Sequence, residues 1–271
     1  MPQRLGQHFL KDKDSLEKIV EALKIEKGDF IVEIGPGHGE LTRELRAKNS
    51  ECRIITIEKD PRLASWILDH KSDDKIEVIQ GDALKVLPQI VSRFKIHDPG
   101  YKLVGNIPYY ITGYLFRIIA DLEPKPEIIV FTIQKEVAER IMGKDGMNLL
   151  AASIQFWAKP EIIDYIPKAA FQPQPKVNSA IIKLTPCSFI DYELQTEYYK
   201  LIKIIFKQPR KTILNNLSAG TEKNKPEISK LRFDISSKLA IEEILKKAGI
   251  DPGSRPQNLS INQLTALSTL F

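Results

Sequence analysis

The chain has 271 residues, of which 42% are hydrophobic and 28% are charged. This is the balance of a soluble globular protein, with length for one large domain or for a main domain and a small one. The apolar runs are too short for a transmembrane helix or a signal peptide, so we expect no membrane partner. Two cysteines exclude a disulfide framework, and the four histidines show no metal-ligand spacing. A cytoplasmic protein without a bound metal is therefore expected.

The chain carries a modest excess of positive charge, and this excess is concentrated late in the sequence. There are 40 Lys and Arg against 35 Asp and Glu, which gives a net charge of +5. The stretch 200–225 alone holds seven basic residues and one acidic residue. Such a stretch can contact phosphates, although lysines at helical spacing also form an ordinary solvated face. The charge distribution therefore permits a nucleic-acid partner without proving one.

The first two thirds of the chain alternate between strand-like and helix-like segments. Short runs rich in Ile, Val and Phe predict buried strands at 30–34, 53–58, 75–79, 101–104 and 128–133. Helices are predicted among them at 41–48, 62–71, 112–122 and 135–142. Two later stretches, 161–166 and 180–184, are expected to close the sheet as an antiparallel pair. The alternation predicts an α/β fold, a parallel sheet with helices on both faces.

The pattern becomes helical after residue 186. Apolar residues from Tyr198 to Phe206 recur at i, i+3, i+4, i+7 and i+8, which is one face of a helix. Further helices are predicted at 213–217, 238–247 and 261–270, with Gly249 ending one and Ser260 capping the last. We therefore expect two domains, an α/β domain over residues 1–188 and a small all-helical domain over 189–271.

A glycine-rich turn joins the first strand to its helix and predicts a ligand site. The turn contains Gly35, Gly37 and Gly39, a G-x-G-x-G spacing. A dinucleotide-binding fold would place its third glycine at position 40, where Glu40 would repel a pyrophosphate. The spacing instead favours a nucleotide-type ligand without phosphates. S-adenosylmethionine is such a ligand.

Carboxylates end the next two predicted strands. Glu58 follows Gly35 by 23 residues, where it can accept hydrogen bonds from both hydroxyls of a ribose. Asp82 follows the third strand and can accept a hydrogen bond from an adenine amino group. Either carboxylate taken alone could simply cap the following helix. The glycine loop and the two carboxylates in this order favour a cofactor site.

The fourth strand ends in Asn106-Ile107-Pro108-Tyr109, which predicts the reaction site. Pro108 favours an extended Ile107, so the Ile107 carbonyl and the Asn106 side chain can point the same way. Together they can accept two hydrogen bonds from an exocyclic amine, while Tyr109 stacks on an aromatic base. Because the lone pair of adenine N6 is delocalised into the ring, such bonds would localise it for attack on a sulfonium methyl group. Taken alone, the motif could also be a proline turn beside a buried tyrosine.

Together these motifs resemble those of the ribosomal RNA adenine N6,N6-dimethyltransferases, and most of all the bacterial small-subunit (16S) enzymes. The similarity covers nearly the whole chain, at 6–10, 33–42, 106–109, 134–140, 171–179, 210–212 and 255–260. The resemblance implies a Rossmann-like, S-adenosylmethionine-dependent methyltransferase sheet that needs no metal. It also implies that the C-terminal helical domain binds rRNA.

The resemblance implies roles for individual residues. A flipped adenine would lie between the rings of Tyr109 and Phe171. The residues expected to take part in catalysis are Asn106, Ile107, Pro108, Tyr109 and Phe171. Those expected to bind the cofactor are His8, Leu10, Gly35, Gly37, Glu58, Asp82 and Asn106. Those expected to contact RNA are Lys207, Arg210 and Lys211.

The implied product is N6,N6-dimethyladenosine at two adjacent adenines in the 3′-terminal hairpin of small-subunit rRNA, made during subunit biogenesis. The partner would be small-subunit rRNA or a pre-30S particle, and we expect a monomer. The sequence departs from the family at His8, where Asn is usual, and at Tyr110 and Gly113, where Asn and Thr are common. Pro209 stands where a second Arg is common, and Gln257 replaces a frequent Glu.

Three other functions share parts of this pattern. The large-subunit rRNA adenine methyltransferases of the macrolide-resistance type share the catalytic motifs, although the stretch 255–260 favours the small-subunit enzymes. A catalytically silent RNA-binding assembly factor could keep the fold, but the intact acceptor motif and cofactor loop argue against lost catalysis. Methyltransferases of DNA or of protein amides have related acceptor motifs, and the segment 171–179 and the helical tail disfavour them.

Overall fold

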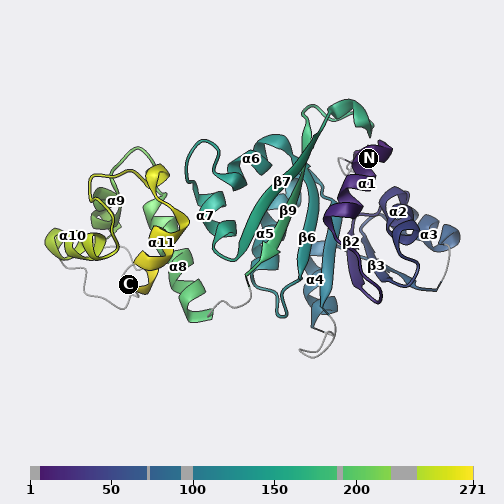
Figure 1. The fold of residues 1–271 in the computed structure, drawn as a ribbon, viewed down its shortest axis with the longest axis horizontal. Helices are drawn as coiled ribbons and strands as arrows, with labels where there is room; N and C mark the ends of the chain where they lie inside the picture. The colour runs from purple at the N-terminus through teal and green to yellow at the C-terminus, as the bar shows by residue number, and fades with distance from the viewer. Residues whose placement is uncertain (1–6, 72–73, 93–99, 188–191, 221–236, 271) are drawn as a thin grey trace. The chain divides into compact units, whose positions relative to one another are not determined.

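The chain folds into two compact units. The computed structural model describes residues 7–71, 74–92, 100–187, 192–220 and 237–270. One unit contains residues 1–138 and 159–186 and holds the main sheet, and the other contains 139–158 and 187–271 and is built mainly from helices (Figure 1). The sequence predicts one boundary, at residue 188. By its contacts, the segment 139–158 groups with the helices instead of the sheet.

A seven-stranded mixed sheet forms the first unit, in the order β4-β3-β2-β5-β6-β9-β7 (Figure 1). The parallel strands are β2 (Phe30–Ile34), β3 (Arg53–Glu58), β4 (Ile76–Gln80), β5 (Tyr101–Asn106) and β6 (Ile128–Gln134). β9 (Ser179–Pro186) pairs with β6 in antiparallel fashion, and β7 (Ala158–Ile166) lies at the edge beside β9. The predicted parallel sheet is confirmed, and the bounds of β2 and β3 match their prediction to the residue.

The order of the strands reverses between β2 and β5. From β2 the chain places β3 and β4 on one side, and it then returns to place β5 and β6 on the other. Open α/β sheets bind ligands at such a point, beyond the carboxyl ends of the strands. Here those ends are Ile34, which leads into the glycine loop, and Asn106, which begins the acceptor motif.

Helices cover both faces of the sheet, as the sequence predicts. On one face, α1 (Lys13–Ala22) and α2 (Glu40–Lys48) share a buried apolar cluster with Ile31 and Val104 of the strands. On the other face, α4 (Ala83–Val91) packs against α5 (Thr112–Ala120), and the Phe116 ring of α5 lies 6.0 Å from that of Phe131 in β6. Because both faces are covered, the strands read as continuous apolar runs. Helix α3 (Pro61–His70) contacts β3 and β4.

Helices α1 and α4 lie outside the predicted segments. Helix α1 has a clear signal, since Asp12 accepts a hydrogen bond from the Ser15 N–H as its N-cap. Helix α4 contains Pro88, and a proline inside a helix removes a hydrogen bond and obscures the helical pattern.

The second unit holds α7 (Leu149–Gln155), α8 (Tyr192–Ile205), α9 (Ile213–Gly220), α10 (Lys238–Lys247) and α11 (Ile261–Thr269), and α6 (Lys135–Met142) spans the division. Its core includes the buried Tyr198, whose ring stacks on Phe156 at 3.9 Å and whose hydroxyl donates to the Ala152 carbonyl. Gly249 adopts a left-handed conformation just after α10, and Ser260 caps α11, as predicted. None of the described helices is both long and apolar enough to cross a membrane.

Candidate active site

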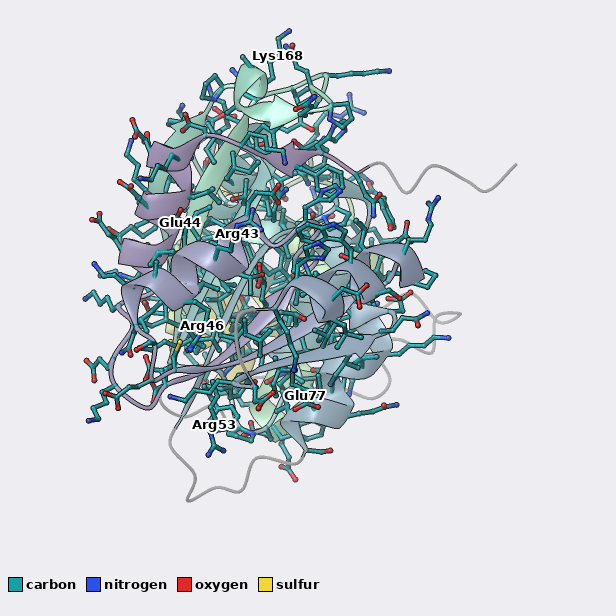
Figure 2. The ribbon with its side chains drawn as sticks, turned by 90° about the vertical axis from the view of Figure 1, so that its right-hand side faces the viewer. Arg43, Glu44, Arg46, Arg53, Glu77 and Lys168 are labelled. Carbon is teal, nitrogen blue, oxygen red and sulfur yellow. The ribbon has the colours of Figure 1, made fainter. Side chains whose placement is uncertain are left out.

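The glycine loop after β2 has a backbone conformation that favours glycine. The φ angles are 68°, 60° and 76° at Gly35, Gly37 and Gly39. A Cβ atom at Gly37 would lie 2.7 Å from the ring of Phe9, so the N-terminal segment lies directly on the loop. Arg43, whose side chain is labelled in Figure 2, belongs to α2. Its guanidinium donates a hydrogen bond to the His38 carbonyl at 2.9 Å, which braces the loop from the helix side.

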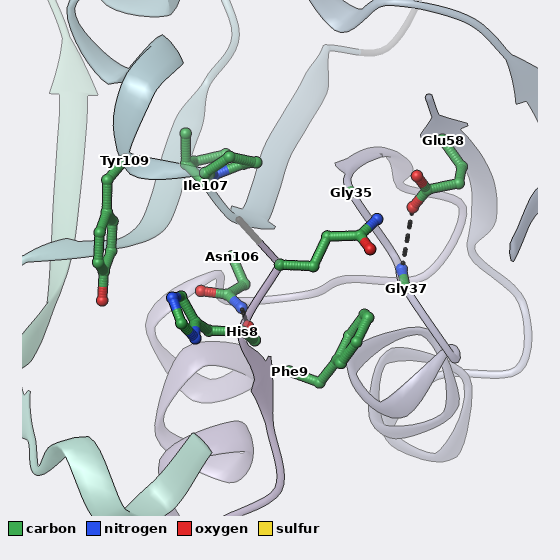
Figure 3. Close-up of a pocket in the computed structure, with 10 residues that line it drawn as sticks. His8, Phe9, Gly35, Gly37, Glu58, Asn106, Ile107 and Tyr109 are labelled. Carbon is green, nitrogen blue, oxygen red and sulfur yellow. Dashed lines mark hydrogen bonds between the residues drawn. The ribbon is translucent and has the colours of Figure 1, made fainter. Parts of the chain in front are cut away.

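Glu58 ends β3 beside this loop, and backbone donors fix its carboxylate. Its Oε2 accepts a hydrogen bond from the Gly37 N–H at 3.2 Å, and its Oε1 accepts one from the Asp60 N–H at 2.9 Å (Figure 3). Burial raises the pKa of Glu58, while these backbone hydrogen bonds oppose the shift. The helix that follows is capped by Asp60 and not by Glu58. Glu58 is therefore available for a ligand, and a carboxylate has room for two further donors such as ribose hydroxyls.

Two cavities share Gly35, Glu58 and Pro108 in their walls. The first is lined further by His8, Phe9, Gly37, Asn106, Ile107 and Tyr109 (Figure 3). The second extends to Lys59, Gly81, Asp82 and Tyr110. The structure thus brings the predicted cofactor residues of β2, β3, β4 and β5 together along one pair of adjoining cavities.

Asp82 lies in the wall of the second cavity and has two partners. Its Oδ1 accepts a hydrogen bond from the Leu84 N–H at 3.1 Å, so this carboxylate does cap α4. Its Oδ2 lies 2.8 Å from the ammonium of Lys59, and the hydrogen bond from Lys59 is the main reason why the pKa of Asp82 is lowered. Both carboxylate oxygens of Asp82 thus have a partner within the protein, and the residue lines the second cavity together with Lys59.

The acceptor motif begins at the end of β5, and its side-chain amide is oriented by the N-terminal segment. Asn106 donates a hydrogen bond from Nδ2 to the His8 carbonyl at 2.6 Å. This leaves Oδ1 of Asn106 as an acceptor. The Ile107 N–H donates to the Thr132 carbonyl of β6 at 3.0 Å, which fixes the motif on the sheet. Pro108 then leads into a short 3-10 turn, η1 (Tyr109–Ile111).

Two rings flank this motif in the first cavity. The Tyr109 hydroxyl lies 2.9 Å from Oγ of Ser179, and burial raises the pKa of the phenol, so Tyr109 is neutral. Nδ1 of His8 lies 2.7 Å from the carbonyl oxygen of Pro173. The centroid of the His8 ring lies 6.1 Å from the centroid of the Tyr109 ring. Figure 3 shows both rings beside the Asn106 carboxamide.

Phe171 does not line the cavity that contains Tyr109. It lies in β8 (Phe171–Gln172), which pairs in antiparallel fashion with β1 (Phe9–Leu10), and it is partnered with Leu10. Its side chain is 5% exposed and belongs to the apolar cluster under α1. Strand pairing with the N-terminal segment buries Phe171 in this structure, and the placement of an adenine between Tyr109 and Phe171 stays a prediction.

A third cavity lies on the other side of the glycine loop. It is lined by Leu10, Glu33, Gly35, Glu40 and Asn106, among others. Glu33 accepts a hydrogen bond from the Thr42 hydroxyl at 2.6 Å, and burial raises its pKa to about 7. Its neighbour Glu40 forms an ion pair with Lys11. Leu10 therefore lies near the glycine loop, and its side chain is mostly buried in the core.

Sequence reasoning assigns no role to three residues that the structure places in these cavities. Phe9 lies within the motif at 6–10, but its contact with Gly37 can be seen only in the structure. Glu33 falls within the motif at 33–42, and a carboxylate inside an apolar strand is a visible signal in the sequence. Lys59 has no sequence signal, because its partner Asp82 is 23 residues away in the chain.

The predicted RNA contacts lie on the surface of the helical unit. Lys207, Arg210 and Lys211 are all exposed in the turn between α8 and α9. Asn216 holds this turn by donating hydrogen bonds to the carbonyls of Gln208 and Thr212. In the same basic stretch, Lys200 pairs with Glu197 at 2.6 Å. Residues 222, 223 and 225 lie outside the described residues.

The donor set of the cavities suits S-adenosylmethionine. Glu58 adds an acidic group to the walls of both adjoining cavities, which disfavours phosphates and favours a ligand that carries a sulfonium and an ammonium group. The left-handed glycines keep side chains out of the space beside these walls. Within the part of the chain that the structure describes, no group of three or more His, Cys, Asp and Glu residues could hold a metal ion.

Comparisons with known proteins identify the family of this chain. The family described as "Ribosomal RNA adenine dimethylase" matches residues 2–250. The "Ribosomal RNA small subunit methyltransferase A" of Clostridioides difficile (strain 630) is 37% identical over 98% of this chain and 89% of its own length. The protein of the same name from Dehalococcoides mccartyi (strain CBDB1) is 35% identical over 96% of this chain and 84% of its own.

Solved structures show the same fold across the whole chain. A dimethyladenosine transferase from Plasmodium falciparum matches with a TM-score of 0.75 and 28% identity over 96% of each chain. The 23S rRNA methyltransferase ErmE matches with a TM-score of 0.72 over 97% of this chain and 98% of its own; at 24% identity, this likeness shows the fold alone. The chain therefore belongs to the ribosomal RNA adenine dimethylase family, a group of enzymes that transfer methyl groups from S-adenosylmethionine to adenine in ribosomal RNA.

Proposed function

We propose that this enzyme methylates N6 of two adjacent adenines in the 3′-terminal hairpin of small-subunit (16S) rRNA and makes N6,N6-dimethyladenosine during subunit biogenesis. The choice of the small subunit is supported by the names of relatives that are 35% and 37% identical over almost the whole chain. The observation that carries the chemistry is the orientation of Asn106, whose Nδ2 is bound to the His8 carbonyl.

Asn106 and Ile107 are proposed to hold the target amine. With Nδ2 engaged, Oδ1 of Asn106 accepts one N6–H, and the Ile107 carbonyl accepts the other. Two such acceptors favour a pyramidal nitrogen with a localised lone pair. After one transfer a single N6–H remains, and Oδ1 can still accept it, so the same pair serves both methylations. In each transfer the methyl group passes from sulfur to N6, S-adenosylhomocysteine is the leaving group, and N6 releases one proton to solvent water.

The cofactor is proposed to lie along the adjoining cavities. Glu58 would bind the ribose hydroxyls, Asp82 would accept from the adenine amino group, and Gly35 and Gly37 would pass beneath them. His8 and Leu10 would close this site from the N-terminal segment. S-adenosylmethionine supplies a methyl group on a positively charged sulfur, so the residues mainly position the reactants.

The exposed turn of the helical unit is proposed to bind the RNA backbone. Lys207, Arg210 and Lys211 present cations to solvent, and phosphate contacts of this kind position a protein without reading sequence. The partner is proposed to be small-subunit rRNA or a pre-30S particle.

A methyl-transfer assay with labelled S-adenosylmethionine tests the proposal. The substrates are undermethylated small subunits, large subunits and free rRNA, and the modified base is mapped by mass spectrometry. We expect dimethyladenosine at adjacent sites in the small subunit only. Label in large-subunit RNA would contradict the substrate, and cofactor binding without any transfer would indicate a binding or assembly factor.

The variant Asn106→Ala tests the acceptor pair in the same assay. We expect it to fold, as judged by circular dichroism, and to lose methyl transfer because one acceptor of the amine is gone. Turnover close to that of the unmodified protein would exclude this mechanism.

A further inference from the structure

An exposed row of residues follows the acceptor motif into the first turns of α5. Tyr110, Gly113, Tyr114 and Arg117 recur at i, i+3, i+4 and i+7, which places them on one face of the helix. The backbone is right-handed helical from the end of η1 into α5, so the face is continuous. All four residues are exposed, with Tyr110 at 54% and Tyr114 at 65%. We call this row the α5 stripe.

Core packing does not account for the two tyrosines of the α5 stripe. The opposite face of α5 carries the residues that the fold buries, and Leu115, Phe116 and Ile119 are each at most 3% exposed. Exposed apolar residues that occur singly are common on protein surfaces. Two large rings and a guanidinium along one helix face form a continuous surface instead, and such a surface suits a partner.

Gly113 leaves a gap between the two tyrosines. A Cβ atom added there would have no atom within 4 Å, and Gly113 is not among the glycines with a positive φ. Neither crowding nor backbone conformation therefore requires glycine at this position, although glycine disfavours a helix. The effect of the missing side chain is an open floor beside the Tyr114 ring, which a flat group can approach closely.

The α5 stripe begins at the reaction site. Tyr110 follows Tyr109 of the acceptor motif and lines the second cavity, and Tyr114 lies one helical turn, about 5.4 Å, further along. An adenine held at Asn106 stays joined to its neighbours through the RNA backbone, so these nucleotides have to cross the surface around the motif. The charge of the helix suits a polyanion, because α5 has one charged side chain, Arg117, and it is basic.

We propose that the α5 stripe is a stacking platform for an unpaired nucleotide next to the target adenine. The base of this nucleotide lies over Gly113 against the Tyr114 ring, and the guanidinium of Arg117 extends the platform. Unpaired RNA bases stack on tyrosine rings and on arginine guanidinium planes. The contact holds the RNA without reading its sequence, because every base has a π face. This inference rests on the proposed function, since it takes the target to be an adenine in rRNA.

The variants separate the ring of Tyr114 from its hydroxyl and from the open floor. Tyr114→Ala removes the ring, Tyr114→Phe keeps it, and Gly113→Leu fills the gap beside it. The matched control is Tyr192→Ala, which removes a 76% exposed tyrosine from α8 in the helical unit. Methyl transfer to undermethylated small subunits gives kcat and KM, calorimetry gives the affinity for S-adenosylmethionine, and circular dichroism checks the fold.

We expect Tyr114→Ala to raise KM for small subunits about five-fold or more, as for the loss of one base-stacking contact. Its kcat and its affinity for S-adenosylmethionine should stay close to those of the unmodified protein, because the reacting groups are untouched. Gly113→Leu should raise KM as well and keep the fold, since its side chain starts in open space. Tyr114→Phe and Tyr192→Ala should keep the KM of the unmodified protein.

Photo-crosslinking identifies what lies on the α5 stripe. The photoreactive residue p-benzoylphenylalanine is placed at position 114, and the protein is irradiated with undermethylated small subunits. We expect crosslinks to rRNA nucleotides that flank the methylated adenines. Crosslinks to a ribosomal protein or to distant nucleotides would give the α5 stripe another occupant and overturn the inference.

The kinetic results can overturn the inference as well. An unchanged KM in both Tyr114→Ala and Gly113→Leu would show that no nucleotide lies on the α5 stripe. An equal rise of KM in Tyr114→Phe and Tyr114→Ala would assign the effect to the hydroxyl and not to stacking. In these cases the unmodified enzyme still methylates the small subunit. If it methylates no adenine there, the proposed function fails and the inference falls with it, which is a distinct result.

Discussion

Glu33 is a carboxyl group whose charge the fold disfavours. It lies within β2, its side chain is buried, and its hydrogen-bond donor is the hydroxyl of Thr42. Burial is the main cause that raises its pKa from 4.5 to about 7, and the charges of Glu58 and Glu40 add to the shift. The folded protein therefore binds this proton more tightly than the unfolded chain does.

The pH dependence of stability follows from this difference. The contribution of Glu33 is complete below pH 4.5 and is lost as the pH rises to 7 and above. Glu33→Gln keeps an acceptor for Thr42 and has no charge, so it should raise the free energy of unfolding above pH 7, by at most roughly 3 kcal/mol. At pH 4.5 or below the effect should be small. Thermal unfolding at several pH values measures the change in the free energy of unfolding, and Glu21→Gln, at an exposed position, is the control. A change caused by Glu33→Gln that is equal at every pH would contradict the prediction.

At the scale of elements, the site depends on a contact between the N-terminal segment and the glycine loop. β1 pairs with β8, and its Phe9 lies against Gly37. The same segment orients Asn106 through the His8 carbonyl. A short strand thus connects the cofactor loop, the acceptor motif and the segment 171–179, although these are far apart in the sequence.

Gly37→Ala tests this contact. The added methyl group would lie 2.7 Å from Phe9 and would sit on a φ of 60°. A suitable control is Gly28→Ala, because Gly28 also has a positive φ, of 85°, but has no atom within 4 Å of its Cβ position. Both variants should lose about 1–2 kcal/mol of stability from backbone strain. Only Gly37→Ala should also lose affinity for S-adenosylmethionine, measured by calorimetry; equal affinity in both variants would exclude the contact as part of the site.

At the scale of the whole molecule, chemistry and RNA binding are assigned to different units. The sheet unit holds the cavities with Asn106 and Glu58, and the helical unit holds the exposed Lys207, Arg210 and Lys211. Substrate affinity should therefore depend on salt through the helical unit, while the methyl-transfer step depends on the sheet unit.

Lys211→Glu tests this division. We expect the variant to bind rRNA more weakly, with the largest difference at low salt. The dependence of affinity on salt concentration should also become shallower, by the contribution of about one phosphate contact. Lys247→Glu makes the same change in net charge at an exposed position of α10 and should have a smaller effect. Filter binding from low to high salt measures both slopes. An unchanged slope in Lys211→Glu would make Lys211 part of an ordinary solvated face.

The sheet and the positions of the main motifs can be predicted from local patterns in the sequence. Runs such as 53–58 are apolar because both faces of the strand are covered. The spaced glycines of the loop and Pro108 each constrain the backbone at their own positions. These signals are local in the chain, so periodicity and composition are enough to find them. They also placed Glu58 and Asn106 at the carboxyl ends of strands, where the cavities occur.

The contacts between side chains of distant segments are visible in the folded protein and not in the sequence. The pairing of Leu10 with Phe171 buries the Phe171 ring, and the N-terminal segment places the His8 ring 6.1 Å from that of Tyr109. Lys59 and Asp82 meet because β3 and β4 are neighbours in the sheet. The grouping of residues 139–158 with the helices is also a matter of long-range packing. Contacts between residues far apart in the sequence leave no periodic signal, because they depend on strand order and on how segments pack.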